Sequence, residues 1–113
     1  MVGGGKRVEY HVEPLGHVVL RVTDGAHFEV VAGKRGEAGL VDSGQGESRL
    51  NGPTSCALSS DRQTLLIADA GNNTVRSLCL ASLELKTLGN GIPHDVTVAV
   101  WKHHDAGIEV PGG

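Results

Sequence analysis

Glycine is the most informative residue of this sequence, because 17 of the 113 residues are glycine and they follow no Gly-X-Y period. Collagen requires that period, and a helix bundle is weakened by each glycine in a helix interior. Most of the glycines fall between short apolar runs, where turns are expected. The chain is therefore predicted to be all-β, with short strands joined by tight turns.

The apolar runs locate the expected strands. Alternation of apolar and polar residues predicts strands before the long glycine-rich segment, and Asp24-Gly25 predicts a hairpin turn between two of them. Leu65 to Ala68 leaves no polar face, which is typical of sheets covered on both sides. Stacked four-stranded antiparallel sheets, as in β-propeller blades, meet that requirement. The expected strands are 8–12, 17–23, 27–32, 55–59, 64–69, 74–80, 84–88 and 95–101.

Charge and hydropathy restrict the class of protein. The formal net charge is -3, which gives no electrostatic footprint for RNA or an anionic membrane. No apolar run approaches the ~20 residues of a membrane span, and residues 1–10 lack the apolar region of a signal peptide. Cys56 and Cys79 show no CxxC spacing and are interpreted as buried small side chains in a reducing compartment. We expect a soluble, intracellular, cytoplasmic protein.

An internal repeat supports the propeller interpretation. Pro53 to Leu58 matches Pro93 to Val98, about 40 residues later, and repeats of that length are propeller periods. Residues 16–21 match residues 71–76 at a larger offset, because the long loop lies between them. Each unit is thus expected to be one four-stranded blade.

The second unit contains five segments that match a known repeat: Val31-Ala32-Gly33, Asp42-Ser43-Gly44, Leu50-Asn51-Gly52-Pro53, Leu66 to Arg76, and the closing Thr87-Leu88-Gly89. On these segments it resembles an NHL repeat over about residues 28–101. It implies NHL-type propeller blades. In the first unit Pro14 takes the position of Asp69, and His17 takes that of Asn72. That blade is therefore degenerate, or its register is different.

The composition of the two ends, together with the resemblance, divides the chain. Residues 1–7 are expected to be a disordered start, 8–101 the NHL-repeat region, and 102–113 a polar tail. A complete propeller needs several blades, so we expect an incomplete one. The repeat region would comprise a partial blade (8–32), a loop (33–52), a full blade (53–88) and the first strand of the next blade (93–101).

Four residues at the centre of the motif are predicted to stabilise a hairpin. Asp69 ends a strand, Gly71 is expected to supply the positive φ of the turn, and Asn72 to bond backbone groups across it. Arg76 should return along the next strand toward Asp69 and satisfy a partly buried carboxylate. The interpretation of these residues is structural.

Two further sets are candidate binding residues. The loop is a candidate partner-binding segment through Lys34, Arg35, Asp42 and Arg49, although it lacks the sequence of a phosphate loop. His94 follows Pro93 at a strand start, where the peptidyl-hydroxyglycine lyases among NHL-type propellers place zinc ligands. Zinc needs three or four ligands, and His94 would supply one.

No sequence motif of a hydrolase or a metalloprotease is present. The expected function is a protein-interaction module with no catalysis and no cofactor of its own, acting as a fragment or subunit of a larger propeller. It would bind a protein partner or associate with itself, and no small-molecule substrate is indicated. The alternatives are part of a zinc-dependent lyase-like propeller, which would bind zinc, and an RNA-binding platform.

Overall fold

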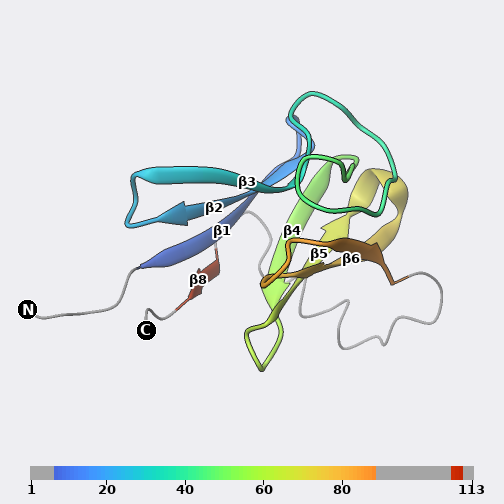
Figure 1. The fold of residues 1–113 in the computed structure, drawn as a ribbon. Coiled ribbons are helices and arrows are strands. Elements are labelled where there is room, and N and C mark those ends of the chain that lie inside the picture. Colours follow the sequence, from blue (N-terminus) through green and yellow to red (C-terminus); the bar gives the residue numbers. More distant parts are fainter. Residues whose placement is uncertain (1–6, 89–107, 111–113) are drawn as a thin grey trace, which may run out of the picture.

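The fold, seen in a computed structural model that describes residues 7–88 and 108–110, consists of two antiparallel four-stranded sheets (Figure 1). The strand order is β3-β2-β1-β8 in the first sheet and β4-β5-β6-β7 in the second. The strands are β1 Val8–Glu13, β2 Val18–Thr23, β3 His27–Gly33, β4 Pro53–Leu58, β5 Thr64–Asp69, β6 Thr74–Cys79, β7 Leu85–Thr87 and β8 Ile108–Val110. The all-β prediction is therefore confirmed. No closed propeller is formed by the part of the chain that the structure describes.

Left-handed residues shape the hairpins. Asp24 and Gly25 have φ of 52° and 72°. Two successive positive φ values are typical of the hairpin turn whose twist matches that of the flanking strands. This turn joins β2 to β3, as expected. The β5–β6 connection contains the short 3-10 helix η1 (Ala70–Asn72) and ends at Asn73 with φ 54°. The β1–β2 connection ends at His17 with φ 61°. Asn and His are both among the non-glycine residues that are enriched in this conformation.

The two hairpins show which positions of the two sheets correspond. Glu13 pairs with Val18 where β1 meets β2, and Asp69 pairs with Thr74 where β5 meets β6. Glu13 is therefore the counterpart of Asp69, and His17 is the counterpart of Asn73. The sequence self-match, which aligned Pro14 with Asp69, is displaced by one residue. The strand pairing determines how the two units align, whereas the self-match contains too few identities to determine it.

The first sheet has one face against the second sheet and one face away from it. Tyr10 and Val19 of the inner face belong to the same core cluster as Cys56, Ile67 and Leu78 of the second sheet. The Cys56 thiol lies 3.8 Å from the carbonyl oxygen of Tyr10 and donates to it. Strand alternation turns the neighbouring side chains outward, on what we call the outer face: Glu9, His11, Val18, Leu20, Val22 and Phe28.

Strand β8 was not predicted, because its residues were assigned to a polar tail. Val8, Glu9 and Tyr10 of β1 pair in antiparallel register with Val110, Glu109 and Ile108. In the first sheet β8 thus takes the place beside β1 that β4 takes beside β5. Three residues are too few for alternation to reveal a strand, and the pairing is with residues far away in the sequence.

The expected start and the expected last strand of the repeat region have different outcomes. Arg7 was placed in a disordered start, but its backbone N–H donates to the Asp24 side chain (2.9 Å), and its carbonyl accepts from the Asp24 N–H (2.7 Å). The strand expected at 93–101 lies outside the described residues.

Candidate functional site

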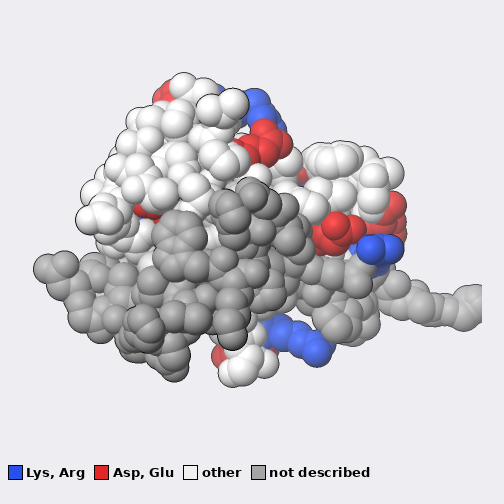
Figure 2. All heavy atoms as spheres, turned by 180° about the vertical axis from the view of Figure 1, so that it is seen from behind, with Lys and Arg blue, Asp and Glu red and all other residues white. Residues whose placement is uncertain are grey.

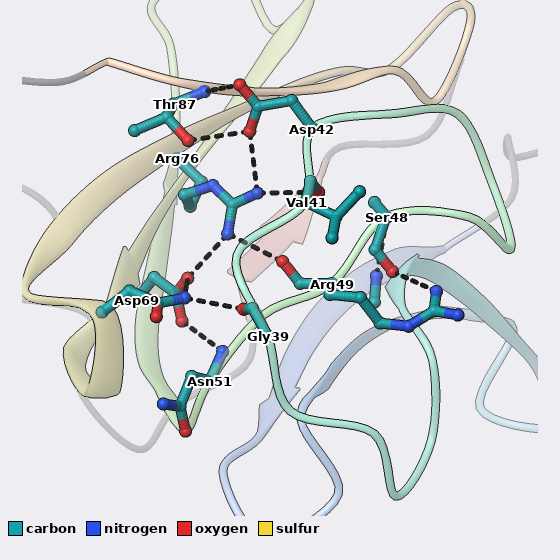
Figure 3. A network of polar contacts seen from close by, with 11 residues as sticks. Gly39, Val41, Asp42, Ser48, Arg49, Asn51, Asp69, Arg76 and Thr87 are labelled. Atoms are coloured by element: carbon teal, nitrogen blue, oxygen red, sulfur yellow. Dashed lines mark hydrogen bonds and ion pairs between the residues drawn. The ribbon is translucent and has the colours of Figure 1, made fainter.

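Arg76 is the centre of a buried polar network (Figure 3), and its side chain is fully buried. Its Nη1 donates to the Oδ2 of Asp69 (2.7 Å) and to the carbonyl of Arg49 (2.8 Å). Its Nη2 donates to the carbonyl of Val41 (3.0 Å) and to the Oδ1 of Asp42 (2.9 Å). One guanidinium thus holds a strand end and two points of the 33–52 loop, because its donors form a rigid fork. We call these residues and their partners the Arg76 network.

Asp69 is also fully buried, and its carboxylate accepts from three directions. Besides Arg76, the backbone N–H of Asn51 donates to Oδ1 (2.7 Å), and the Asn72 side-chain amide donates to Oδ2 (2.7 Å). The same Asn72 amide donates to the carbonyl of Gly39 (2.8 Å). A buried carboxylate is tolerated only when it is paired and hydrogen-bonded in this way.

Asp42 connects the loop to the outermost strand of the second sheet. Its carboxylate accepts from the backbone N–H of Thr87 (3.0 Å) and from the Thr87 hydroxyl (2.7 Å), in addition to Arg76. Partial burial alone would raise the pKa of Asp42, but the hydrogen bonds from Thr87 and Arg76 outweigh it and lower that pKa. Asp42 was predicted as a partner-binding residue, and the structure uses it to fasten the loop.

Gly71 is required for a reason other than the one expected. The positive φ of this turn is at Asn73, and Gly71 is absent from the left-handed residues. A Cβ at Gly71 would lie 2.4 Å from the carbonyl oxygen of Asn51 and 2.5 Å from its side-chain Cγ. The glycine therefore permits a close approach of the loop, and its N–H donates to the Asn51 carbonyl (2.7 Å).

The structure brings Asp69, Asn72 and Arg76 together, with Gly71 beside them. Sequence reasoning missed their loop partners, above all Asn51, because nothing in a periodic pattern links a loop backbone to a strand. All four Asp69 and Asp42 carboxylate oxygens accept hydrogen bonds from the chain itself. The network is thus occupied by internal contacts and fixes the loop onto the second sheet.

The cations of the loop are also engaged within the chain. Lys34 and Arg49 form ion pairs with Glu37 (3.2 and 3.3 Å), and Arg35 pairs with Glu13. Hydrogen bonding to Lys34 lowers the pKa of Glu37. On the face seen in Figure 2, described basic and acidic side chains lie next to each other rather than in a patch of one sign. Such a surface does not attract a polyanion over long range.

The outer face of the first sheet contains an open hollow of about 470 Å³. Its apolar part is formed by Leu20 and Val22, which are nearly buried, and by Phe28, which is 62% exposed. The carboxylate of Glu9 accepts from His11 Nε2 at the edge of the hollow (3.0 Å). The full lining is Glu9, His11, Val12, Glu13, Leu20, Val22, Gly25 and Phe28. An exposed aromatic beside aliphatic side chains is typical of protein contact surfaces.

The remaining candidates concern metals, thiols and membranes. His94 lies outside the described residues, and among residues 7–88 and 108–110 no group of three or more ligands could hold a metal ion. Cys56 is buried as predicted, but Cys79, the last residue of β6, is exposed, so the prediction for Cys79 was wrong. In the same part of the chain no helix is long and apolar enough to cross a membrane.

A scan against family models, a search of curated proteins and a search of solved structures each gave no match for this chain.

Proposed function

We propose that this protein is an interaction module built from two NHL-type propeller blades and that it works by binding protein. Three strands of each sheet follow one another in corresponding order, and the sheets stack face to face around a shared core. The NHL-like residues of the second unit support the assignment, since they form the Arg76 network that fixes the loop to the blade. The chain is then a subunit or a piece of a larger propeller, and it acts in the cytoplasm.

The observation that carries the proposal is the apolar hollow on the outer face of the first sheet. In the second sheet the corresponding face packs on its neighbour through Ile67 and Leu78. A blade buries both faces in a propeller, because its strands cannot cover their own apolar residues. Leu20, Val22 and Phe28 would therefore receive a protein surface, from a partner or from a second copy.

The proposal includes no catalytic step and no cofactor. The buried ion pair of Asp69 and Arg76 is used to hold the fold together. No contact among the described residues favours the zinc-dependent or the RNA-binding alternative. Zinc binding measured with the full chain, with His94→Ala as its control, would bring the zinc alternative back.

Light scattering of the purified full chain over a range of concentrations tests the proposal. Self-association through the outer face predicts a defined oligomer whose mass falls to the monomer in Phe28→Glu. The matched control is Leu15→Glu, because Leu15 is 96% exposed and does not line the hollow. If the native chain is an oligomer that Phe28→Glu leaves intact, the outer face is not the contact surface. A folded monomer with no affinity for protein in any cytoplasmic extract contradicts the proposed function.

A further inference from the structure

Asn51 and the peptide that joins it to Gly52 are held by hydrogen bonds to β5, to the β5–β6 connection and to the β1–β2 connection. The N–H of Asn51 donates to Asp69 (2.7 Å), and the Asn51 carbonyl accepts from Gly71 (2.7 Å). The N–H of Gly52 donates to the Nδ1 of His17 (3.0 Å), although His17 lies in the β1–β2 hairpin, far away in the sequence. A backbone amide thus has an imidazole nitrogen as its acceptor.

Asn-Gly is the dipeptide at which an asparagine side chain is most open to attack by the next backbone nitrogen, since glycine has no Cβ to obstruct the approach. That attack requires removal of the proton from the glycine N–H. A general base must be within hydrogen-bond reach of the proton it takes, at about 2.6–3.2 Å. His17 Nδ1 meets this condition for Gly52.

We propose that Asn51-Gly52 is a self-modification site, at which His17 acts as general base in the conversion of Asn51 to aspartate and isoaspartate. The Gly52 nitrogen forms a bond to the Asn51 Cγ, and its proton passes to His17 Nδ1. The C–N bond of the side-chain amide breaks, and the nitrogen leaves as ammonia with that proton. Water then opens the five-membered imide at either carbonyl. One water is consumed and one ammonia is released, with no change of oxidation state.

The conformation of His17 supports this role. Its φ of 61° is left-handed, and its counterpart in the second sheet, Asn73, has φ 54°. Histidine and asparagine are both enriched at positive φ, and at this position the histidine supplies a ring nitrogen to the neighbouring sheet. Because Nδ1 accepts the hydrogen bond from the Gly52 N–H, the proton of the imidazole ring is on Nε2.

The reaction would loosen the Arg76 network. Isoaspartate adds one carbon to the main chain between residue 51 and Gly52, and the imide leaves the Gly52 nitrogen without a proton to donate to His17. The main-chain hydrogen bonds of residue 51 to Asp69 and Gly71 would then no longer align. The modification would therefore release the loop from the second sheet as the protein ages.

The test is peptide mapping by mass spectrometry of the full chain, incubated folded near neutral pH and, separately, unfolded in urea. The expected result is faster conversion of Asn51 in the folded chain than in urea, with ammonia release to match. His17→Asn is the matched variant, since asparagine accepts both the left-handed φ and the Gly52 N–H but is not a base. It should slow the folded-state reaction by about 100-fold, the lower range of general-base catalysis.

Two outcomes overturn the proposal: slower conversion of Asn51 in the folded chain than in urea, or an equal folded-state rate in His17→Asn. If His17→Asn does not fold, His17→Gly replaces it, because glycine accepts the left-handed φ and supplies no base. An equal folded-state rate in His17→Gly also overturns the proposal. Asn90 also precedes a glycine, Gly91, in the same chain. Its conversion in urea is the internal control for the rate of an unfolded Asn-Gly pair.

Discussion

At the scale of single residues, the central feature is a guanidinium that is completely buried yet bonded on both terminal nitrogens. Arg76 and Asp69 have side chains with no exposed surface, and desolvation of two charges costs several kcal/mol for each ion. The pair is therefore retained for what it orders, which is the loop that presents the Val41 and Arg49 carbonyls. Lysine would offer a single ammonium group, whereas the planar guanidinium of Arg76 donates from two terminal nitrogens.

Removal of Arg76 is expected to destabilise the protein strongly. Arg76→Met should lower the free energy of unfolding by about 3–5 kcal/mol, because the Asp69 carboxylate is left buried without its cation. Urea unfolding measures the change. Lys86→Met is the control, since Lys86 is mostly exposed. Adding Asp69→Asn to Arg76→Met should recover part of the lost free energy of unfolding. If the double variant instead loses the sum of the two single losses, Asp69 and Arg76 are not coupled.

At the scale of elements, cross-strand pairs hold the first sheet together. Arg21 of β2 lies opposite Glu29 of β3, and its Nη2 donates to Glu29 Oε1 (2.7 Å). Gln45 of the loop donates to the same carboxylate (3.2 Å) and to the Val30 carbonyl (2.9 Å). The loop thus covers part of the edge of β3, a place where an unprotected strand invites pairing with another chain.

Stability should depend on pH through Glu29. The hydrogen bond from Arg21, together with that from Gln45, lowers the pKa of Glu29 below its ordinary value of 4.5. This stabilisation is complete above about pH 4.5 and is lost as the pH falls through the lower native pKa. Because the pair is partly exposed, it contributes only about 0.5 kcal/mol.

Urea unfolding at neutral and at acidic pH measures this contribution. Glu29→Gln should remove that part of the acid dependence, whereas Glu47→Gln, at an exposed loop position, should leave it unchanged. An acid dependence that is identical in Glu29→Gln and the native chain would show that this pair does not contribute.

At the scale of the whole molecule, the two sheets share one core and should unfold together. Cys56 of β4 lies at the contact between them, and burial raises the pKa of its thiol to about 12. Cys79, at the end of β6, is exposed, and a hydrogen bond with Ser82 lowers the pKa of its thiol. The thiolate is the reactive form, so the two cysteines report on different events.

A thiol reagent should therefore modify Cys79 quickly in the native protein and Cys56 only after the sheets separate. We expect one fast-reacting thiol per chain, and a second that appears along the same urea curve as the loss of β-structure. Cys79→Ser should abolish the fast phase. Fast labelling of Cys56 under native conditions would mean that the sheets open independently of global unfolding.

The sequence alone determined the class of fold and most of the strands, since turn residues and alternation act over a few neighbouring positions. It also predicted that Arg76 reaches Asp69, because both lie on one hairpin. The tertiary structure decided what links distant segments: the Asn51, Asp42 and Arg49 contacts, the β8 pairing, and the register that relates the two sheets. Those contacts depend on how the loop closes over the second sheet, and closure over long separations leaves no periodic trace in the sequence.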